Sequence, residues 1–333
     1  YYPHFNVQDS NLSWTVNFGS SGFTYTQPTD HLAINAANMF TATSPAIEDG
    51  TAHMQTTLYS GTSSTLEVNQ SENSTFQPDL LWIKSRAASS NQVWIDAVRG
   101  ASKQQYSNAA VADATESDGV TSFDADGFTV GDDSGDYVNR SGENMLAWQW
   151  NAGGSTVSNG DGSLASNVRA NQTAGFSIVS YTGNGGSGGA QTVGHGLGAK
   201  PNMIIIKNLS TTDNWVVYHD DIGFNAGTLN SSAARITTGA SVYWNDTAHT
   251  STIFNVNTHA GVNGNGNSMI AYCYTSIPGF SKFDGYIGNN NADGTFVELG
   301  FTPAWLMIKR ITAVENWHIF NNKSDPFNPA GRY

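Results

Sequence analysis

The sequence is poor in cysteine and in long apolar runs, and each shortage excludes a class of protein. A single cysteine, Cys273, among 333 residues excludes an internal disulfide. Its apolar neighbours predict a buried thiol rather than a reactive one. No apolar run approaches the roughly 18 residues that a membrane-spanning helix needs. The sequence has no initiator methionine and no signal peptide, so we expect it to be an internal piece of a longer protein.

Positive charge is also scarce. The chain has 14 Lys and Arg residues against 27 Asp and Glu, a formal net charge of −13. Nucleic-acid phosphates and anionic membrane surfaces both attract clusters of Lys and Arg, and the sequence contains no such cluster. We therefore expect no nucleic-acid partner and no membrane insertion. We interpret the acidity as a contribution to solubility.

The residues that are abundant favour short strands and turns. Gly, Ser, Thr and Asn are frequent, and no stretch has the Ala, Leu, Glu and Lys content of a long helix. Hydrophobic residues make up 38% of the chain and aromatic residues 11%, which is enough to build a core and argues against disorder. This composition predicts an all-β chain of antiparallel strands.

A set of landmarks recurs three times along the chain. Each copy contains an apolar run that begins with proline and ends with a lysine, which we call the repeat lysine. A Tyr-x-Gly triplet precedes each run and an aromatic-rich segment follows it, an order that indicates tandem copies of one folded unit. Tandem β units favour a rod, a spacer or a multivalent binder over a single-cleft enzyme. The runs are residues 78–84, 201–207 and 303–309, the triplets 59–61, 181–183 and 286–288, and the aromatic segments 93–95, 215–218 and 317–320.

A longer match supports the first two copies. Residues 138–150 align without a gap to residues 262–274, at an offset of 124 (262 − 138). The alternation of side chains along both segments predicts a strand. The continuous run Ile204-Ile205-Ile206 predicts a strand that is buried on both faces. Seven or eight short strands in about 100 residues predict an antiparallel, jelly-roll-like β-sandwich for each repeat.

These landmarks divide the chain into five parts. We expect the end of a separate β-sandwich with a linker at 1–50, a first repeat at 51–154 and a linker with one short strand at 155–175. A second repeat then occupies 176–280, and the start of a third, truncated repeat occupies 281–333.

Catalytic signatures are weak. Paired carboxylates on one strand, spaced as Glu-x-Asp-x-Glu, are absent, so we do not expect an enzyme. His219-Asp220-Asp221 resembles a general-base cluster, but we interpret it as the polar end of a strand. The Gly-x-Ser-x-Gly match at 185–189 lies in a glycine-rich tip with no helix after it, unlike a nucleophile elbow.

Four aspartates, all in one turn-rich stretch, are candidate metal ligands. Calcium takes carboxylate oxygens of this kind, but the spacing does not match an EF-hand. We favour solvated turn residues and keep a weak Ca²⁺ site as the alternative; no other cofactor is expected. The four residues are Asp124, Asp126, Asp132 and Asp133.

Aromatic residues are candidates for glycan binding, because a sugar ring stacks on an exposed aromatic face beside Asn and Asp. We expect Trp244, with Tyr243 and Asn245, to be exposed in a turn-rich stretch, and we add Trp94 as a weaker candidate. Trp215 and Trp317 both follow a repeat lysine by eight residues (215 − 207 and 317 − 309), which favours a core role for both.

The sequences of these landmarks resemble a tandem β-sandwich module of tail-fibre and virion-appendage proteins of marine tailed bacteriophages. The matching phrases lie at 76–86, 193–198, 300–310 and 325–329, and the resemblance covers about residues 51–333. It implies a concanavalin-like or laminin-G-like sandwich. Residues 14–23 separately resemble the closing strands of an SPRY-like sandwich, which commonly precedes such modules.

The resemblance implies a location and a role. We expect a structural or adhesive part of a virion appendage that presents loops to a host-surface glycan and contacts other virion proteins. Fibres of this kind are usually trimers, so a homo-oligomer is expected by analogy, and repetition would add avidity. A capsid- or tail-decorating protein without a receptor role is the alternative, and a polysaccharide-degrading enzyme is a further one.

Overall fold

The computed structural model describes residues 46–71, 74–324 and 326. The SPRY-like segment expected near the N-terminus lies outside the described residues. The described chain is almost entirely β, and every pairing between its named strands is antiparallel. Its helices are each a few residues long, and none is long and apolar enough to cross a membrane.

The first repeat is a sandwich of a six-stranded sheet, in the order β1-β9-β3-β4-β5-β6, and a three-stranded sheet, β2-β8-β7. The short 3₁₀ turn η1 (Gly50–Ala52) leads into it. A turn at residues 125 and 126 joins β7 to β8, and Gly127 follows it at a φ of 133°. The strands are β1 (Met54–Ser60), β2 (Leu66–Asn69), β3 (Leu80–Ser85), β4 (Val93–Asp96), β5 (Lys103–Tyr106), β6 (Ala114–Thr115), β7 (Val120–Asp124), β8 (Gly127–Val130) and β9 (Asn144–Trp150).

The second repeat has a seven-stranded sheet, β10-β11-β12-β18-β14-β15-β16, faced by the pair β13-β17 and two short helices. The segment 155–175, expected to be a linker with one short strand, instead supplies the two strands β10 and β11 at the edge of this sheet. The elements are β10 (Val157–Asn159), β11 (Ser166–Asn171), β12 (Phe176–Thr182), β13 (Gln191–Gly194), β14 (Met203–Asn208), β15 (Val216–His219), η2 (Asp220–Ile222), β16 (Gly227–Thr228), α2 (Ser241–Trp244), β17 (Ile253–Val256), α3 (Ala260–Asn263) and β18 (Ser268–Tyr274).

The third repeat forms one hairpin among the described residues, β19 (Trp305–Ile308) with β20 (His318–Asn321). It corresponds to β3–β4 and to β14–β15, because the three hairpins pair in the same register relative to their repeat lysines.

The Tyr-x-Gly triplet connects a long strand to the segment that precedes the last long strand of its repeat. The Tyr59 hydroxyl donates to the Val138 carbonyl at 2.6 Å, and the Tyr181 hydroxyl donates to the Val262 carbonyl at the same distance. A Cβ at Gly61 would lie 2.2 Å from the carbonyl oxygen of Arg140, so only glycine fits there. The acceptor carbonyls recur at the offset of 124 that the sequence shows, and the tyrosines recur at an offset of 122 (181 − 59).

The third triplet lacks these contacts. Tyr286 is 51% exposed, and Gly288 has open space where a Cβ would lie. Ile287 and Phe296, which precede the hairpin, are each 89% exposed and lie in no strand. The described residues provide no counterpart of β9 or β18 for this repeat, so the segment before β19 has no strand with which to pair.

Alternate side chains of each central strand enter different cores. On β14, Ile204 and Ile206 lie in the core of the second sandwich, whereas Met203 and Ile205 face the opposite way. β3 divides its residues between the core of the first sandwich and the same opposite core. The prediction of burial on both faces from the Ile run is therefore confirmed, since all of β14 is buried.

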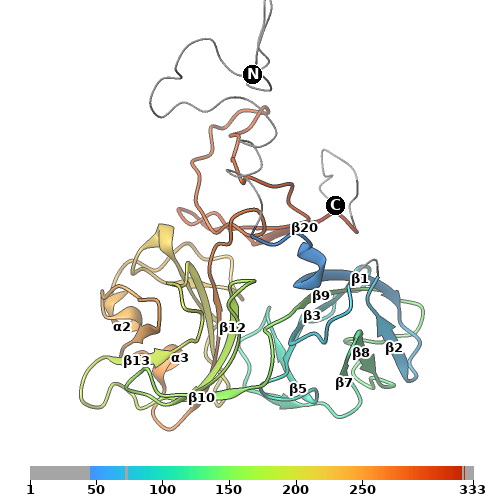
Figure 1. Ribbon diagram of the computed structural model, residues 1–333, viewed down its shortest axis with the longest axis horizontal. Coiled ribbons are helices and arrows are strands. Elements are labelled where there is room, and N and C mark those ends of the chain that lie inside the picture. Colours follow the sequence, from blue (N-terminus) through green and yellow to red (C-terminus); the bar gives the residue numbers. More distant parts are fainter. Residues whose placement is uncertain (1–45, 72–73, 325, 327–333) are drawn as a thin grey trace, which may run out of the picture.

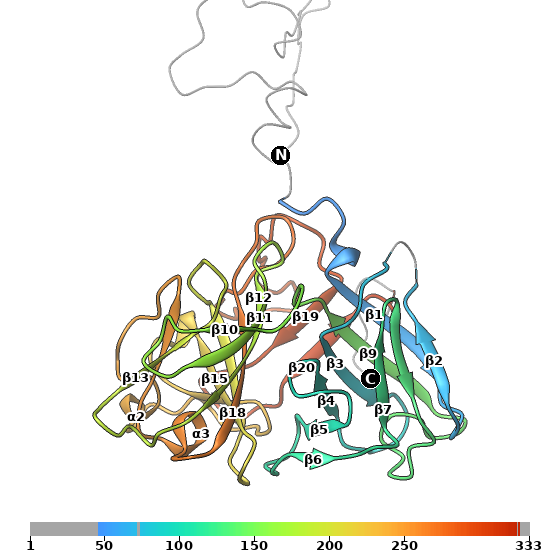
Figure 2. The ribbon, with the colours of Figure 1, turned by 60° about the horizontal axis from the view of Figure 1, so that its bottom comes forward.

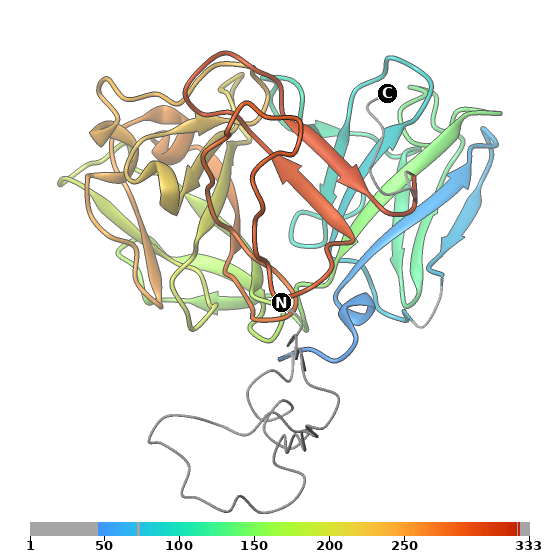
Figure 3. The ribbon, with the colours of Figure 1, turned by 90° about the horizontal axis from the view of Figure 1, so that it is seen from above.

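The opposite faces of the sheets meet in one shared core, which contains residues of all three repeats. Corresponding positions, two residues before each repeat lysine, all contribute: Trp82, Ile205 and Met307. Figures 1 and 2 show the two sandwiches side by side, and Figure 3 shows the red β19–β20 hairpin between them. The repeats are thus joined laterally around a common core rather than end to end as a rod.

Candidate functional site

The interface between the first and second repeats includes two specific hydrogen bonds. The Trp215 indole Nε1 donates to the Tyr106 carbonyl at 2.9 Å, and the backbone N–H of Asp113 donates to the Leu209 carbonyl at 2.7 Å. Trp215 lies eight residues after its repeat lysine, and Leu209 lies two residues after it. Trp215 is fully buried, so its bond satisfies an indole N–H that has no access to water.

Both hydrogen bonds recur at the interface between the second and third repeats. Trp317 Nε1 donates to the Thr228 carbonyl at 2.9 Å, and the N–H of Arg235 donates to the Ile311 carbonyl at 3.0 Å. Trp317 and Ile311 again lie eight and two residues after the repeat lysine. Tyr106 and Thr228 also correspond, because each pairs with the first residue of the preceding strand. One interface geometry is therefore used twice.

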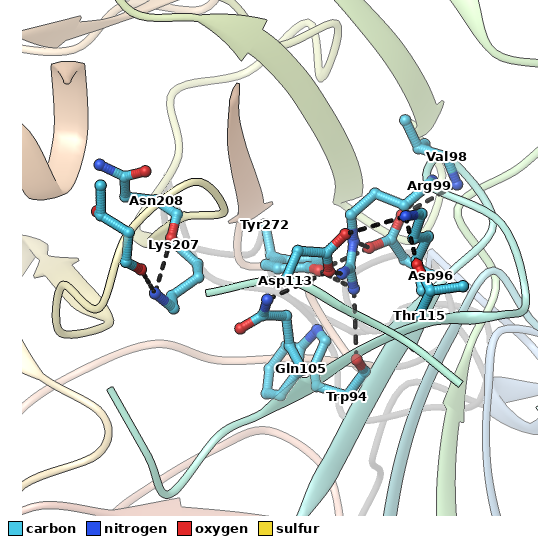
Figure 4. Close-up of polar contacts among 12 residues, drawn as sticks. Trp94, Asp96, Val98, Arg99, Gln105, Asp113, Thr115, Lys207, Asn208 and Tyr272 are labelled. Carbon is cyan, nitrogen blue, oxygen red and sulfur yellow. Dashed lines mark hydrogen bonds and ion pairs between the residues drawn. The ribbon is translucent and has the colours of Figure 1, made fainter. Parts of the chain in front are cut away.

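A buried polar group reinforces the first interface. Figure 4 shows Asp96, Arg99 and Asp113 together with Tyr272 of the other repeat. Arg99 Nε lies 2.5 Å from Asp96 Oδ2, its Nη1 lies 2.7 Å from Asp113 Oδ1, and the Tyr272 hydroxyl donates to Asp96 at 2.7 Å. Burial, followed by the charge of Asp96, raises the pKa of Tyr272 well above its ordinary value, so this hydroxyl stays a donor.

A groove of about 990 Å³ lies where a third interface of this kind, between the third repeat and the first, would be expected. We call it the open groove. Arg86 and Gln92 lie in its wall, two and eight residues after the first repeat lysine, where Leu209 and Trp215 lie in the second repeat. Trp82 and Trp148 also line it; both are buried, and neither indole N–H has a partner among the described residues. The far wall is β20 with Trp317.

The chemistry of the open groove suits binding. Two basic side chains, Lys84 and Arg86, line it together with serine, asparagine and aromatic residues, and no carboxylate lines it among the residues that the structure describes. No motif in the sequence pointed to this groove. The available sequence signal for the site was the position eight residues after each repeat lysine. Trp215 and Trp317 occupy it in the second and third repeats, whereas Gln92 occupies it in the first.

The aromatic residues predicted to bind a glycan are not at the surface. Trp244 is fully buried, and its Nε1 donates to the Asn225 carbonyl at 3.1 Å; Tyr243 is 8% exposed. The expectation of an exposed Trp244 was wrong, because α2 turns both rings into the core of the second sandwich. Asn245 is exposed, in the left-handed conformation that ends α2. Trp94 is 1% exposed and lies in the shared core, so it also cannot stack on a sugar.

A small polar hollow lies beside α2 nevertheless. It has a volume of about 360 Å³ and is lined by polar residues, among them Asn225 and Asp246, with Phe224 in its wall. The buried Trp244 holds the backbone of Asn225 at its rim. This part of the second repeat therefore keeps one partly exposed aromatic ring beside amide, hydroxyl and carboxylate groups.

The four aspartates proposed for calcium do not converge. Asp124 accepts hydrogen bonds from the hydroxyls of Ser122 and Thr129, and buried Asp133 accepts from two backbone N–H groups. Asp126 lies in the β7–β8 turn, and Asp132 is exposed. In the described part of the chain, no group of three or more His, Cys, Asp or Glu residues is placed to hold a metal ion.

The other reactive-looking groups have structural roles. His219 accepts the N–H of Asp221 at the start of η2, and Asp220 accepts from the Tyr218 hydroxyl and pairs with Lys200 at 2.7 Å. Cys273 is fully buried, as the sequence predicts, and burial raises the pKa of its thiol above the ordinary range.

The fold and its interfaces define an all-β protein of sandwich-type repeats joined by a shared core. Residues 49–333 match the model of a family described as Domain of unknown function (DUF7483), and the chain belongs to that family. The match spans all three repeats together. No curated protein and no solved structure matches the chain.

Proposed function

We propose that this protein is a structural and adhesive part of a virion appendage of a tailed phage. The observation that carries the structural role is the interface used twice, in which the Trp215–Tyr106 bond recurs as Trp317–Thr228. An interface that buries its polar groups in the same way at each step joins repeats into a rigid block. The resemblance of the landmarks to tail-fibre modules supports the location.

Immunogold electron microscopy of the source particle, with antibodies against residues 176–280, tests the location. Gold on a tail appendage is the expected result. Gold over the capsid or along the tail wall would favour a decorating protein without a receptor role, and unlabelled particles would overturn the proposal.

The adhesive role would belong to the polar hollow beside α2. Its partly buried Phe224 offers a ring face, and Asp246 offers hydrogen-bond acceptors to sugar hydroxyls. Glycan-array binding by the whole chain should fall at least about tenfold in Asp246→Ala, since hydrogen bonds to charged groups contribute about 1.5 to 3 kcal/mol. Asp293→Ala, which changes an exposed acid in a turn that does not line the hollow, is the matched control. Equal binding by the two variants would remove the hollow as the sugar site.

A further inference from the structure

The four histidines of the second repeat, each buried or partly buried, share one arrangement: the ring Nδ1 accepts a backbone N–H. An imidazole nitrogen that accepts a hydrogen bond carries no proton, so each of these rings is neutral and has its proton on Nε2. The bonds run from Leu197 to His195 at 3.2 Å, from Asp221 to His219 at 3.2 Å, from Asn255 to His249 at 3.1 Å and from Gly261 to His259 at 3.0 Å.

Three of these histidines belong to the layer that faces the seven-stranded sheet, formed by β13, β17, α2 and α3, which we call the facing layer. His195 follows β13, His249 precedes β17, and His259 is the N-cap of α3. Figures 1 and 2 show β13, α2 and α3 on the side of the second sandwich away from the first repeat. His219 ends β15 in the sheet itself, 3.3 Å from a carboxylate oxygen of Asp221, and is not part of this layer.

Two of the imidazole rings hold α2 in place. The His249 ring packs edge-on against Tyr218 of the sheet, with ring centroids 4.2 Å apart, and against Trp244 at 5.8 Å. The His259 ring stacks on Tyr243 at 4.1 Å. Tyr243 and Trp244 are the two rings that α2 directs into the core, so α2 is attached through contacts with neutral histidines.

A second proton on His249 is incompatible with this arrangement. It would turn Nδ1 into a donor that faces the Asn255 N–H, and the bond between them would be lost. Burial lowers the pKa of His249 to about 4; Lys200 and His195 add to this shift, and the Asp220 carboxylate opposes it. The closed layer therefore resists protonation of this ring.

The other two histidines respond to acid in the same direction. His195 also donates from Nε2 to the Thr250 carbonyl at 3.2 Å, which ties the end of β13 to the segment before β17. Burial lowers the pKa of His195, opposed by that bond and by Asp161, and burial lowers the pKa of His259, opposed by Asp213. Protons thus act against the facing layer at three points.

We infer that the facing layer is an acid-sensitive switch: when its three neutral histidines gain protons, α2 and β17 loosen from the seven-stranded sheet while the sheet stays folded. A loosened layer protonates His249 near pH 6.5, and the closed layer only near pH 4. The stability of the closed layer is therefore complete above about pH 6.5 and falls as pH falls toward 4. Loosening also moves Trp244 and Asp246, so acid should release a bound sugar; this consequence rests on the proposed function of the polar hollow.

Hydrogen exchange of the full chain at about pH 7.5 and about pH 5, corrected for the intrinsic pH dependence of exchange, tests the switch. Opening at residues 240–259 should rise about thirtyfold from His249 alone, because its pKa differs by 2.5 (6.5 − 4) between the loosened and closed layers. The central strands β12 and β18 of the same sandwich should change far less.

Two variants and a control locate the effect. His249→Asn keeps an acceptor for the Asn255 N–H but takes up no proton, so most of the thirtyfold rise should disappear. His259→Asn places a favoured N-cap residue at the start of α3 and should remove a smaller part of the rise, even if His249→Asn does not fold. His318→Asn changes a partly exposed histidine of β20 and should keep the full response.

The outcomes separate the switch from the sugar site. Equal opening of residues 240–259 at the two pH values, or a rise of equal size in β12 and β18, would overturn the switch. So would an undiminished rise in both His249→Asn and His259→Asn. Sugar that dissociates at the lower pH from the native chain but not from His249→Asn would support both proposals. A chain that binds no sugar at either pH, yet shows the local rise in exchange, would contradict the sugar site and support the switch.

Discussion

The Trp215 indole N–H of the second repeat donates to the Tyr106 carbonyl of the first at 2.9 Å, and Trp317 of the third repeat makes the same bond to Thr228 of the second. A tryptophan at a fixed distance from the repeat lysine thus acts as a joint between successive repeats. Because each joint lies beside the shared core, the repeats support each other's apolar faces.

Removal of the Trp215 indole should reduce the stability of the fold more than removal of another buried indole. Trp215→Phe removes the indole donor to the Tyr106 carbonyl, which keeps the Ala109 N–H at 3.1 Å, and we expect a loss of about 1 kcal/mol in the free energy of unfolding beyond the packing loss. Trp94→Phe controls for packing, because Trp94 is equally buried and its N–H has no partner among the described residues. Urea unfolding of both variants measures the difference; equal losses would contradict the role of the joint.

The repeat lysines should differ in importance. Lys207 is fully buried and donates to the carbonyls of Asn208, Thr211 and Asp213, and burial lowers its pKa to about 8. Lys207→Met should destabilise the protein by about 2 to 4 kcal/mol, since three carbonyls lose a charged donor. Lys84 is only partly buried and, among the described residues, donates to the Ser85 carbonyl alone, so Lys84→Met should cost less than about 1 kcal/mol. Thermal unfolding in which the two variants lose equal stability would refute this account.

The tyrosine of the Tyr-x-Gly triplet should contribute to stability only where its hydroxyl donates a hydrogen bond to a backbone carbonyl. Tyr181→Phe removes the donor to the Val262 carbonyl and should cost about 1 kcal/mol in stability. Tyr286→Phe changes a ring that is half exposed and should leave stability unchanged. A substantial loss in the second variant, measured by chemical denaturation, would mean that the third triplet has a partner of its own.

Asp79 should make stability depend on pH. Burial raises its pKa to about 6, although Arg169 at 2.8 Å opposes the shift. The folded state therefore holds this proton more tightly than the unfolded state, whose carboxyl titrates near 3.8. The resulting stability is present below about pH 4 and is lost as pH rises through 6, by up to about 3 kcal/mol.

Comparison with Asp79→Asn isolates this contribution. The difference in unfolding free energy between the native chain and the variant should shift against the native chain from pH 4 to pH 7. Parallel stability curves for the two proteins would show that Asp79 ionises equally easily in both states.

Local patterns predicted much of the fold. The Ile204–Ile206 run indicated a strand buried on both faces, and the offset of 124 located corresponding strands in two repeats. Tyr243 and Trp244 were misplaced, because a turn-rich composition does not reveal which way a four-residue helix directs its rings. The spacing of Gln92, Trp215 and Trp317 marked the interface positions but not the open groove itself, since Arg86 and β20 lie far apart in sequence and meet only once the three repeats surround one core.

The shared core is the central claim, and hydrogen exchange at increasing urea concentration tests it most directly. Peptides that contain β4, from the first repeat, and β15, from the second, report on the two sides of that core. The account predicts that both lose protection at the same urea concentration, because neither sandwich keeps its covered face without the other. Two well-separated midpoints would show that the repeats fold independently and would contradict the account.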